Sequence, residues 1–288
     1  MQISGRWLLR ALGISLIAAA LCGYLSLCLL FYQGQWQIVF HPSRSITATP
    51  SDSGVPFDDV RFDATEAGAL QLDGWWIPAE PASRYANSTL LYFHDGKGSL
   101  SYAVGDLKTL HSLGINIFAF DYRGFGRSAE THPSEERVYQ DADAAWSYLT
   151  DTRHLDPRTI IFFGDGLGAA IAAEAAVRHA SAAGLILQDP APPGLALINS
   201  DPRTRLLPVR LLFHDRFDLD TKLRQLKLPK LLLATRPDAD SVRRAKAAFQ
   251  AATEPKDYFE FANGIDGQRM PRYLESLRRF LDQQLHLH

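Results

Sequence analysis

A glycine-rich turn in the middle of the chain has the spacing of a catalytic motif. An apolar run at residues 160–163 leads into Gly164-Asp165-Gly166-Leu167-Gly168, and an alanine-rich stretch follows at residues 169–179. This pattern predicts a buried strand, a tight turn and a helix. When the middle residue of G-x-S-x-G is serine, the turn presents a nucleophile for acyl transfer. The residue in that place here is Gly166, which has no side chain to attack a carbonyl carbon.

The same turn also fits a dinucleotide-binding motif. Gly164, Gly166 and Ala169 match the pattern G-x-G-x-x-G/A. Asp189 follows about twenty residues later, where an acidic residue would bind the ribose. A dinucleotide-binding fold normally begins with its glycine turn, whereas about four strands are predicted before this one. Asp189 precedes Pro190 and is typical of a loop cap. Dinucleotide binding therefore stays open as the weaker alternative.

Composition limits the class of protein. The chain has 288 residues, of which 46% are hydrophobic, enough for one large α/β domain. Its 30 Lys and Arg nearly balance its 32 Asp and Glu, so no basic excess indicates nucleic-acid binding. The two cysteines, Cys22 and Cys28, both lie in an N-terminal apolar stretch. This placement excludes disulfides, cysteine metal sites and cysteine nucleophiles from the rest of the chain. We expect no metal and no cofactor.

The N-terminus predicts a membrane anchor. Residues 11–32 contain no charged side chain, and a helix of that length crosses a hydrocarbon layer of about 30 Å. Arg6 and Arg10 precede the stretch, which favours a folded domain on the extracytoplasmic side of a single-pass protein. Residues 18–20 are alanines, so a cleaved signal peptide is the alternative. We assign residues 1–32 to a signal anchor and residues 33–56 to a juxtamembrane linker.

Strand and helix patterns alternate through residues 57–288. Alternation of this kind predicts a mostly parallel sheet covered on both faces. The first two strands read as an antiparallel hairpin. The region at about residues 189–229, rich in proline and short of strong patterns, predicts a small cap. Strands are expected at 60–62, 70–77, 89–93, 115–120, 160–163, 184–187, 231–234 and 258–261, with helices at 104–113, 135–150, 169–179, 220–226, 242–252 and from 271.

Three segments together resemble one family. They are Tyr92-Phe93-His94-Asp95-Gly96, the stretch D-Y-R-G-F-G-R-S at residues 121–128, and the turn around Gly166. Their order is similar to that of the α/β-hydrolase superfamily, most closely its small membrane-anchored serine hydrolases related to serine aminopeptidases and monoacyl-ester hydrolases. The resemblance covers residues 57–288. It implies an α/β-hydrolase fold: an eight-stranded, mostly parallel sheet with helices on both faces and a short cap.

The resemblance also implies where a catalytic triad would stand. Its nucleophile position is Gly166 and its acid position is Asp238. Its base position is Ile265, in a loop without histidine. The backbone amides of Gly96 and Leu167 would be the two oxyanion donors. Because both the serine and the histidine are replaced, the family pattern implies a degenerate triad.

Other polar residues near these loops are candidates for a displaced nucleophile or its helpers. Ser99 and Ser101 follow the first loop, and Ser128 ends the second. Hydroxyls in such places commonly cap turns. His94 is a further candidate, although the family histidine in that place usually supports the loop through hydrogen bonds.

Carboxylates are the remaining candidates. Asp165, with Asp238 and Asp266, is a possible cluster that would hold water or a cation, although separate surface aspartates are the commoner arrangement. Asp95 replaces the glycine that is usual in the family, which puts a negative charge close to the oxyanion donors.

We therefore expect a membrane-anchored α/β-hydrolase-like pseudoenzyme that binds a small acyl ligand or a protein partner. The alternatives are an ester or amide hydrolase with a displaced nucleophile and the dinucleotide-binding protein.

Overall fold

The computed structural model describes residues 5–284, except residues 65–67, 69 and 262. Its main element is an eight-stranded sheet in the order β10-β9-β8-β7-β4-β6-β3-β2. All neighbouring strands pair in parallel except β3, which runs antiparallel to both β2 and β6. The predicted eight-stranded sheet with an antiparallel start is confirmed. The strands are β2 (Asp58–Asp63), β3 (Gln71–Ile77), β4 (Tyr85–Phe93), β6 (Ile115–Asp121), β7 (Ile160–Asp165), β8 (Gly184–Gln188), β9 (Lys230–Ala234) and β10 (Lys256–Glu260).

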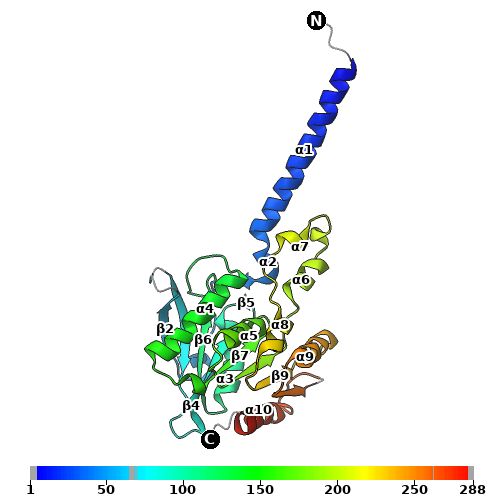
Figure 1. Cartoon of the computed structure of the whole chain (residues 1–288). Helices are drawn as coiled ribbons and strands as arrows, with labels where there is room; N and C mark the ends of the chain where they lie inside the picture. Colours follow the sequence, from blue (N-terminus) through cyan, green and yellow to red (C-terminus); the bar gives the residue numbers. More distant parts are fainter. Residues whose placement is uncertain (1–4, 65–67, 69, 262, 285–288) are drawn as a thin grey trace.

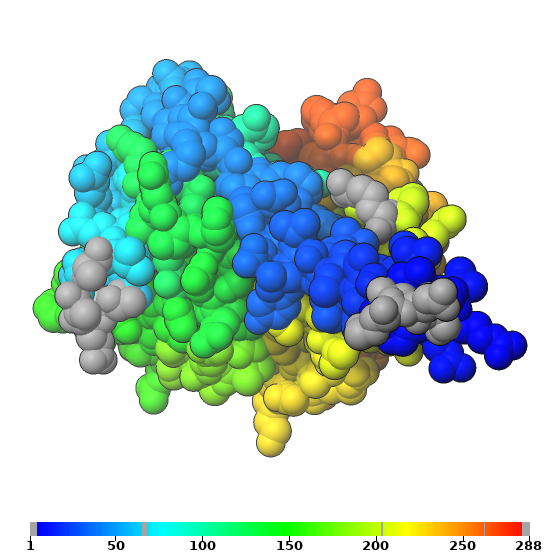
Figure 2. All heavy atoms as spheres, turned by 90° about the horizontal axis from the view of Figure 1, so that it is seen from above, coloured from blue at the N-terminus to red at the C-terminus, as the bar shows by residue number. Residues whose placement is uncertain are grey.

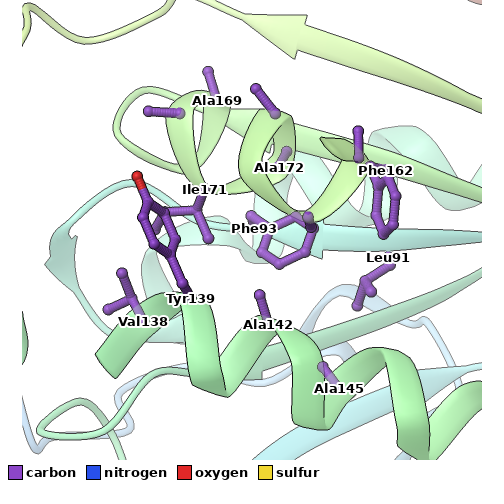
Figure 3. Close-up of a cluster of buried hydrophobic side chains, with 14 of the residues drawn as sticks. Leu91, Phe93, Val138, Tyr139, Ala142, Ala145, Phe162, Ala169, Ile171 and Ala172 are labelled. Carbon is purple, nitrogen blue, oxygen red and sulfur yellow. The ribbon is translucent and has the colours of Figure 1, made fainter. Parts of the chain in front are cut away.

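Helices cover both faces of the sheet (Figure 1). One apolar cluster includes α4 (Glu135–Ser147), α5 (Gly168–Arg178) and α9 (Ala239–Ala251); the cluster on the other face includes α3 (Val104–His111) and α10 (Met270–Arg279). The alanines of α4 and α5 let these helices approach Phe93 and Phe162 closely (Figure 3). Short helical segments complete the domain: η2 (Leu100–Ala103), η3 (Tyr148–Thr152), η4 (Pro157–Thr159) and η6 (Phe280–Gln284).

The N-terminal helix α1 (Gly5–Gly34) projects from the domain (Figure 1). Its most apolar window has a mean hydropathy of 2.3, and none of that window is buried in the protein. The helix is therefore long and apolar enough to cross a membrane. It contains the whole of the predicted span, residues 11–32.

The juxtamembrane segment, residues 35–53, differs from the expected linker because it packs on the domain. It contains α2 (Trp36–Val39), β1 (His41–Pro42) and η1 (Pro50–Ser53). β1 pairs in parallel with β5 (Lys97–Gly98), the short strand that follows the loop after β4. Val39 and Phe40 are buried in the main apolar cluster. Burial of these two side chains favours docking of the segment over a free tether.

The region between β8 and β9 forms the cap. It contains α6 (Gly194–Ser200), η5 (Pro202–Thr204), α7 (Val209–Leu212) and α8 (Leu219–Gln225). In Figure 1, α6 and α7 stand beside the domain end of α1. Hydrogen bonds join the cap to the N-terminal chain: the Tyr24 hydroxyl donates to the Leu206 carbonyl at 3.2 Å, and the Gln35 amide donates to the Leu212 carbonyl at 3.1 Å and accepts from the His214 amide at 3.0 Å.

Candidate functional site

The glycine turn lies at the carboxyl edge of the sheet, between β7 and α5. Gly166 stands at its apex with φ of +58°, a left-handed conformation that favours glycine. A side chain on either flanking glycine would meet backbone: a Cβ on Gly164 would lie 2.3 Å from the Gly168 carbonyl oxygen, and one on Gly168 would lie 2.0 Å from that of Phe93. The predicted strand, turn and helix are confirmed, and this turn has the shape of a nucleophile elbow without a nucleophile.

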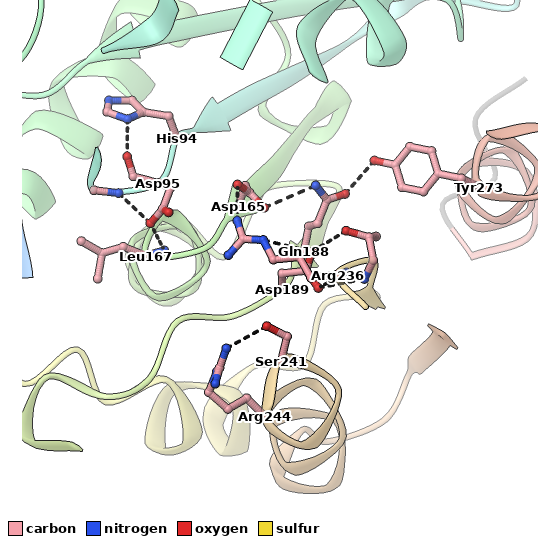
Figure 4. A network of polar contacts seen from close by, with 12 residues as sticks. His94, Asp95, Asp165, Leu167, Gln188, Asp189, Arg236, Ser241, Arg244 and Tyr273 are labelled. Atoms are coloured by element: carbon pink, nitrogen blue, oxygen red, sulfur yellow. Dashed lines mark hydrogen bonds and ion pairs between the residues drawn. The ribbon is translucent and has the colours of Figure 1, made fainter. Parts of the chain in front are cut away.

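The carboxylate of Asp95 lies at the two backbone amides that the sequence predicted as oxyanion donors (Figure 4). Its Oδ1 accepts hydrogen bonds from the Gly96 amide at 2.8 Å and from the Leu167 amide at 3.1 Å. These are the two donors that the sequence predicted, and the structure brings them together on one acceptor. The Leu167 amide is at the N-terminal end of α5, where the helix dipole favours a negative charge. Both donors are therefore satisfied from within the protein.

The same carboxylate fills the space above Gly166. An ideal Cβ on Gly166 would lie 2.6 Å from both Cγ and Oδ1 of Asp95. Contacts this short do not occur between real side chains, so a serine at position 166 would require Asp95 to move.

The juxtamembrane segment covers this loop from the outside. The His41 amide donates to the Gly96 carbonyl at 2.7 Å, and a Cβ on Gly96 would lie 3.4 Å from the Val39 carbonyl oxygen. Leu167 is only 3% exposed. The loop that carries the Gly96 amide thus lies beneath chain that the sequence predicted to be a linker.

His94 supports the loop from inside. Its ring stacks on Tyr122, with 4.3 Å between ring centroids, and meets Phe125 edge-on. Nδ1 is 2.6 Å from the Asp95 carbonyl oxygen, and Nε2 lies 3.6 Å from a carboxylate oxygen of Asp121. Burial lowers the pKa of His94 to about 4, so the ring is neutral at pH 7.

The three candidate serines are tied to backbone. Ser99 and Ser101 donate to carbonyl groups of the juxtamembrane segment, at 2.9 Å in each case. Ser128 donates to the Asp121 carbonyl and accepts from the Asp73 amide. All three side chains are buried. The contacts of Ser99 and Ser101 hold the juxtamembrane segment on the domain, and those of Ser128 hold its loop.

Asp165, at the end of β7 and the start of the turn, belongs to a polar network (Figure 4). One carboxylate oxygen is 3.3 Å from the Arg236 guanidinium, and the other accepts from Gln188 at 3.3 Å. The Tyr273 hydroxyl donates to the same Gln188 side chain at 2.8 Å. Burial raises the pKa of Asp165 to about 7, and the charge of Arg236 opposes that rise.

The other predicted carboxylates have different partners from Asp165. Asp238 caps α9 by accepting from the Ser241 amide at 2.7 Å, and Asp266 pairs with Arg269. No group of three His, Cys, Asp or Glu side chains suited to a metal ion occurs within the described part of the chain. The cluster of Asp165, Asp238 and Asp266 considered from the sequence is therefore not formed.

Ile265, which the family resemblance assigns to the base position, packs against the apolar cluster that includes α10. A hydrocarbon side chain there stabilises the loop and offers no proton acceptor.

The features that sequence reasoning missed are Arg236, Gln188 and Tyr273. Gln188 ends β8, and Arg236 follows β9 by two residues, so both lie at the carboxyl edge where loops of neighbouring parallel strands meet. Their position next to strand ends was a signal that could have found them. Tyr273 comes from α10 and carries no such signal.

The dinucleotide motif has a different structural explanation. The glycine turn follows the fifth strand of the sheet along the chain, and the strand order is not that of a dinucleotide-binding fold. The Asp189 carboxylate accepts from the Thr235 amide at 2.8 Å and pairs with Arg236. Asp189 therefore joins two loops of the sheet edge.

A groove of about 840 Å³ lies between the juxtamembrane segment, the start of α4 and the cap. Trp36 stacks on His132 at 4.6 Å, and Tyr32 meets His214 edge-on at 4.9 Å. These aromatic pairs hold three separate parts of the chain at one surface hollow.

Comparisons with known proteins place this fold. A family model described as serine aminopeptidase, S33, matches residues 88–254, more than half of the chain. The uncharacterized protein Rv2307c of Mycobacterium tuberculosis is 28% identical over 94% of this chain and 95% of its own length. The α/β-hydrolase domain-containing protein 17C of Mus musculus is 30% identical, covering 79% of this chain and 68% of that protein.

Solved structures agree on the architecture. The esterase Pf2001 of Pyrococcus furiosus has a TM-score of 0.64 at 19% identity, covering 86% of this chain and 98% of that one. An α/β-hydrolase of Vibrio vulnificus has a TM-score of 0.62 at 24% identity, covering 79% and 82%. At these identities the likeness shows the fold alone. With the sheet order, the elbow-shaped turn and the match over residues 88–254, the chain belongs to the serine aminopeptidase (S33) family of the α/β-hydrolase superfamily.

Proposed function

We propose that this protein is a membrane-anchored α/β-hydrolase-like pseudoenzyme with a binding or scaffolding role. The observation that carries the proposal is the Asp95 carboxylate, which holds both oxyanion donors and lies over Gly166. Three independent requirements of acyl transfer are then unmet at one site: a nucleophile at position 166, a base at position 265 and free donors for the oxyanion.

Residual catalysis is not expected from this arrangement. In the protease studied as a template, removal of the triad leaves about 10³ to 10⁴ over water, supplied by the oxyanion hole and substrate binding. Here the amides of Gly96 and Leu167 already bind a carboxylate. A substrate carbonyl would have to displace a charged acceptor from charge-assisted hydrogen bonds, which are about twice as strong as neutral ones.

The serine positions give no support to a hydrolase with a displaced nucleophile. Ser99, Ser101 and Ser128 each donate to a backbone carbonyl. An attacking hydroxyl needs a base that accepts its proton, and the hydrogens of these three are directed to carbonyl oxygens.

A ligand or partner is more easily bound in the surface groove than at the former catalytic centre. The juxtamembrane segment packs on the Gly96 loop, whereas the groove of about 840 Å³ is open and lined with aromatic and charged side chains. The groove lies next to the end of α1, so a ligand or partner held there would sit close to the membrane surface. The charge of Arg6 and Arg10 supports placing the folded domain on the extracytoplasmic side.

The test uses the purified full chain in detergent with a fluorophosphonate probe and short-chain nitrophenyl esters. We expect no labelling and no turnover above heat-denatured protein. Mass spectrometry would map any labelled residue. Covalent labelling of Ser99, Ser101 or Ser128, together with turnover lost on the matching alanine substitution, would overturn the proposal.

A further inference from the structure

The tip of the cap exposes two large apolar side chains. Leu206 is 81% exposed and Leu211 is 77% exposed. Among described residues outside α1, these two and Tyr102 are the large hydrophobics that remain mostly in contact with solvent. Isolated exposed leucines are common, but here two of them lie within six residues, next to a helix suited to a membrane.

The cap tip is fixed at a defined height along α1. The Tyr24 hydroxyl donates to the Leu206 carbonyl, so Leu206 is level with a residue that lies ten positions before the end of the helix at Gly34. At 1.5 Å per residue, this is about 15 Å up the helix from its base. Figure 1 shows α7 beside the domain end of α1, and Figure 2 shows the cap close to α1 when the helix is viewed from above.

The proposed function requires α1 to span a bilayer. The position of Leu206 along α1 then determines whether its side chain lies in hydrocarbon or in water. A hydrocarbon layer of about 30 Å takes about 20 residues of helix. The shallowest placement on the described helix is residues 5–24, which puts the edge of the layer at Tyr24, level with Leu206. That placement would bury Arg6 and Arg10 in hydrocarbon, which is costly. The layer therefore shifts toward residues 11–30, and Leu206 then lies inside it.

The charges beside the leucines fit this position. Arg205 and Arg210 are exposed and flank the two leucines. Arginine side chains next to a hydrocarbon layer extend to the lipid phosphate groups, which carry the opposite charge.

We infer that the cap tip, residues 205–211, is a second membrane contact that inserts into the leaflet on the side of the folded domain. Leu206 and Leu211 lie among acyl chains, and Arg205 and Arg210 bind lipid phosphates. The cap is thereby held at the bilayer by its own side chains, in addition to the span of α1.

The inference is tested on the full chain in liposomes of phosphatidylcholine and phosphatidylglycerol. Cys22 and Cys28 are changed to alanine, and single cysteines carrying the fluorophore NBD are introduced by Leu206→Cys, Leu16→Cys or Ala82→Cys. Position 16 is in α1, and the exposed position 82 precedes β4 at the opposite end of the sheet (Figure 1). We expect lipids with a nitroxide on the acyl chain to quench the fluorophore at positions 206 and 16, and to leave position 82 unquenched.

The three positions separate this inference from the proposed anchor. Quenching at 16 without quenching at 206 overturns the inserted cap and leaves the anchor intact. If neither position 16 nor position 206 is quenched, both the proposed anchor and the inserted cap are overturned. A blue-shifted but unquenched fluorophore at 206 indicates contact with a second protein copy, which also overturns the inference.

Discussion

The side chain of Asp95 takes the place that a side chain on Gly166 would occupy: an ideal Cβ on Gly166 would lie 2.6 Å from the Asp95 carboxyl carbon. The two residues come from different loops, after β4 and after β7. Gly166 and Asp95 are compatible with each other. The glycine at the apex leaves room for the Asp95 carboxylate, and that carboxylate accepts hydrogen bonds from the two amides that a substrate would otherwise meet.

This relationship predicts coupled stabilities. Gly166→Ala should lower the free energy of unfolding by about 1–2 kcal/mol, because alanine is strained in the left-handed backbone conformation of this position. The clash of the new Cβ with Asp95 should lower it further. In the background Asp95→Gly the clash is gone, so the same alanine should cost less, with a coupling of about 0.5–3 kcal/mol. Urea unfolding of the four proteins in the cycle measures it. Additive costs would show that the two positions do not share this space.

Esterase activity should return only when Asp95 is removed together with restoration of the triad. We expect Asp95→Gly/Gly166→Ser/Ile265→His to hydrolyse nitrophenyl acetate, because it has a nucleophile, a base and free donors. The matched control is Gly166→Ser/Ile265→His, which keeps Asp95 and should be slower by about 10²-fold or more, the usual effect of losing an oxyanion donor. Equal rates in the two variants would mean that Asp95 does not block the site.

Gln35 should hold the cap to the juxtamembrane segment. Its buried amide donates to the Leu212 carbonyl at 3.1 Å and accepts from the His214 amide at 3.0 Å. Gln35→Ala leaves these backbone groups unpaired, at a cost of about 1–3 kcal/mol, and should speed hydrogen exchange of amides in residues 209–214. The control is Gln37→Ala, an exposed position in α2 that should leave exchange unchanged. Equal exchange in both variants would contradict the role of Gln35.

Asp165 should make stability fall with rising pH. Its pKa is about 7 in the folded protein, raised by burial from an ordinary value of 3.8. Below that ordinary value both states bind the proton. As pH rises toward 7 the unfolded state ionises first, so the free energy of unfolding decreases, and above about 7 the effect is complete. Asp165→Asn removes this dependence.

Urea unfolding at pH 4.5 and 7.5 tests that sign. The control is Asp238→Asn, because hydrogen bonds from Ser241 lower the pKa of the exposed Asp238. Stability from Asp238 is therefore lost only as pH falls through its lowered value, outside the tested window. A wild-type slope equal to that of Asp165→Asn would contradict the assignment.

The sheet was predictable because its pattern is local. Buried strands such as β7 and β9 are short apolar runs with glycine or proline nearby, and helices such as α5 are rich in alanine. Boundaries moved by a few residues, as for β4, which begins at Tyr85 in place of Thr89. The cap helices α6 and α7 were not predicted, because they are short and are held by contacts with distant chain.

The candidate site was only partly predictable for the same reason. The sequence identified the amides of Gly96 and Leu167 and raised a carboxylate next to them. It could not show that Asp95 turns back onto both donors, since that depends on a side-chain rotamer and on the packing of two loops. The covering juxtamembrane segment was missed because polar Ser, Thr and Pro residues between apolar segments usually indicate a linker.

The pairing of β1 with β5 has a mechanical consequence. The chain that leaves α1 at Gly34 already pairs with the loop after β4 at His41, so little of it is left as a free tether between the helix and the domain. With so short a tether, we expect rotation of α1 about its own axis to turn the domain with it. Insertion of a flexible spacer after Gly34 would separate these motions.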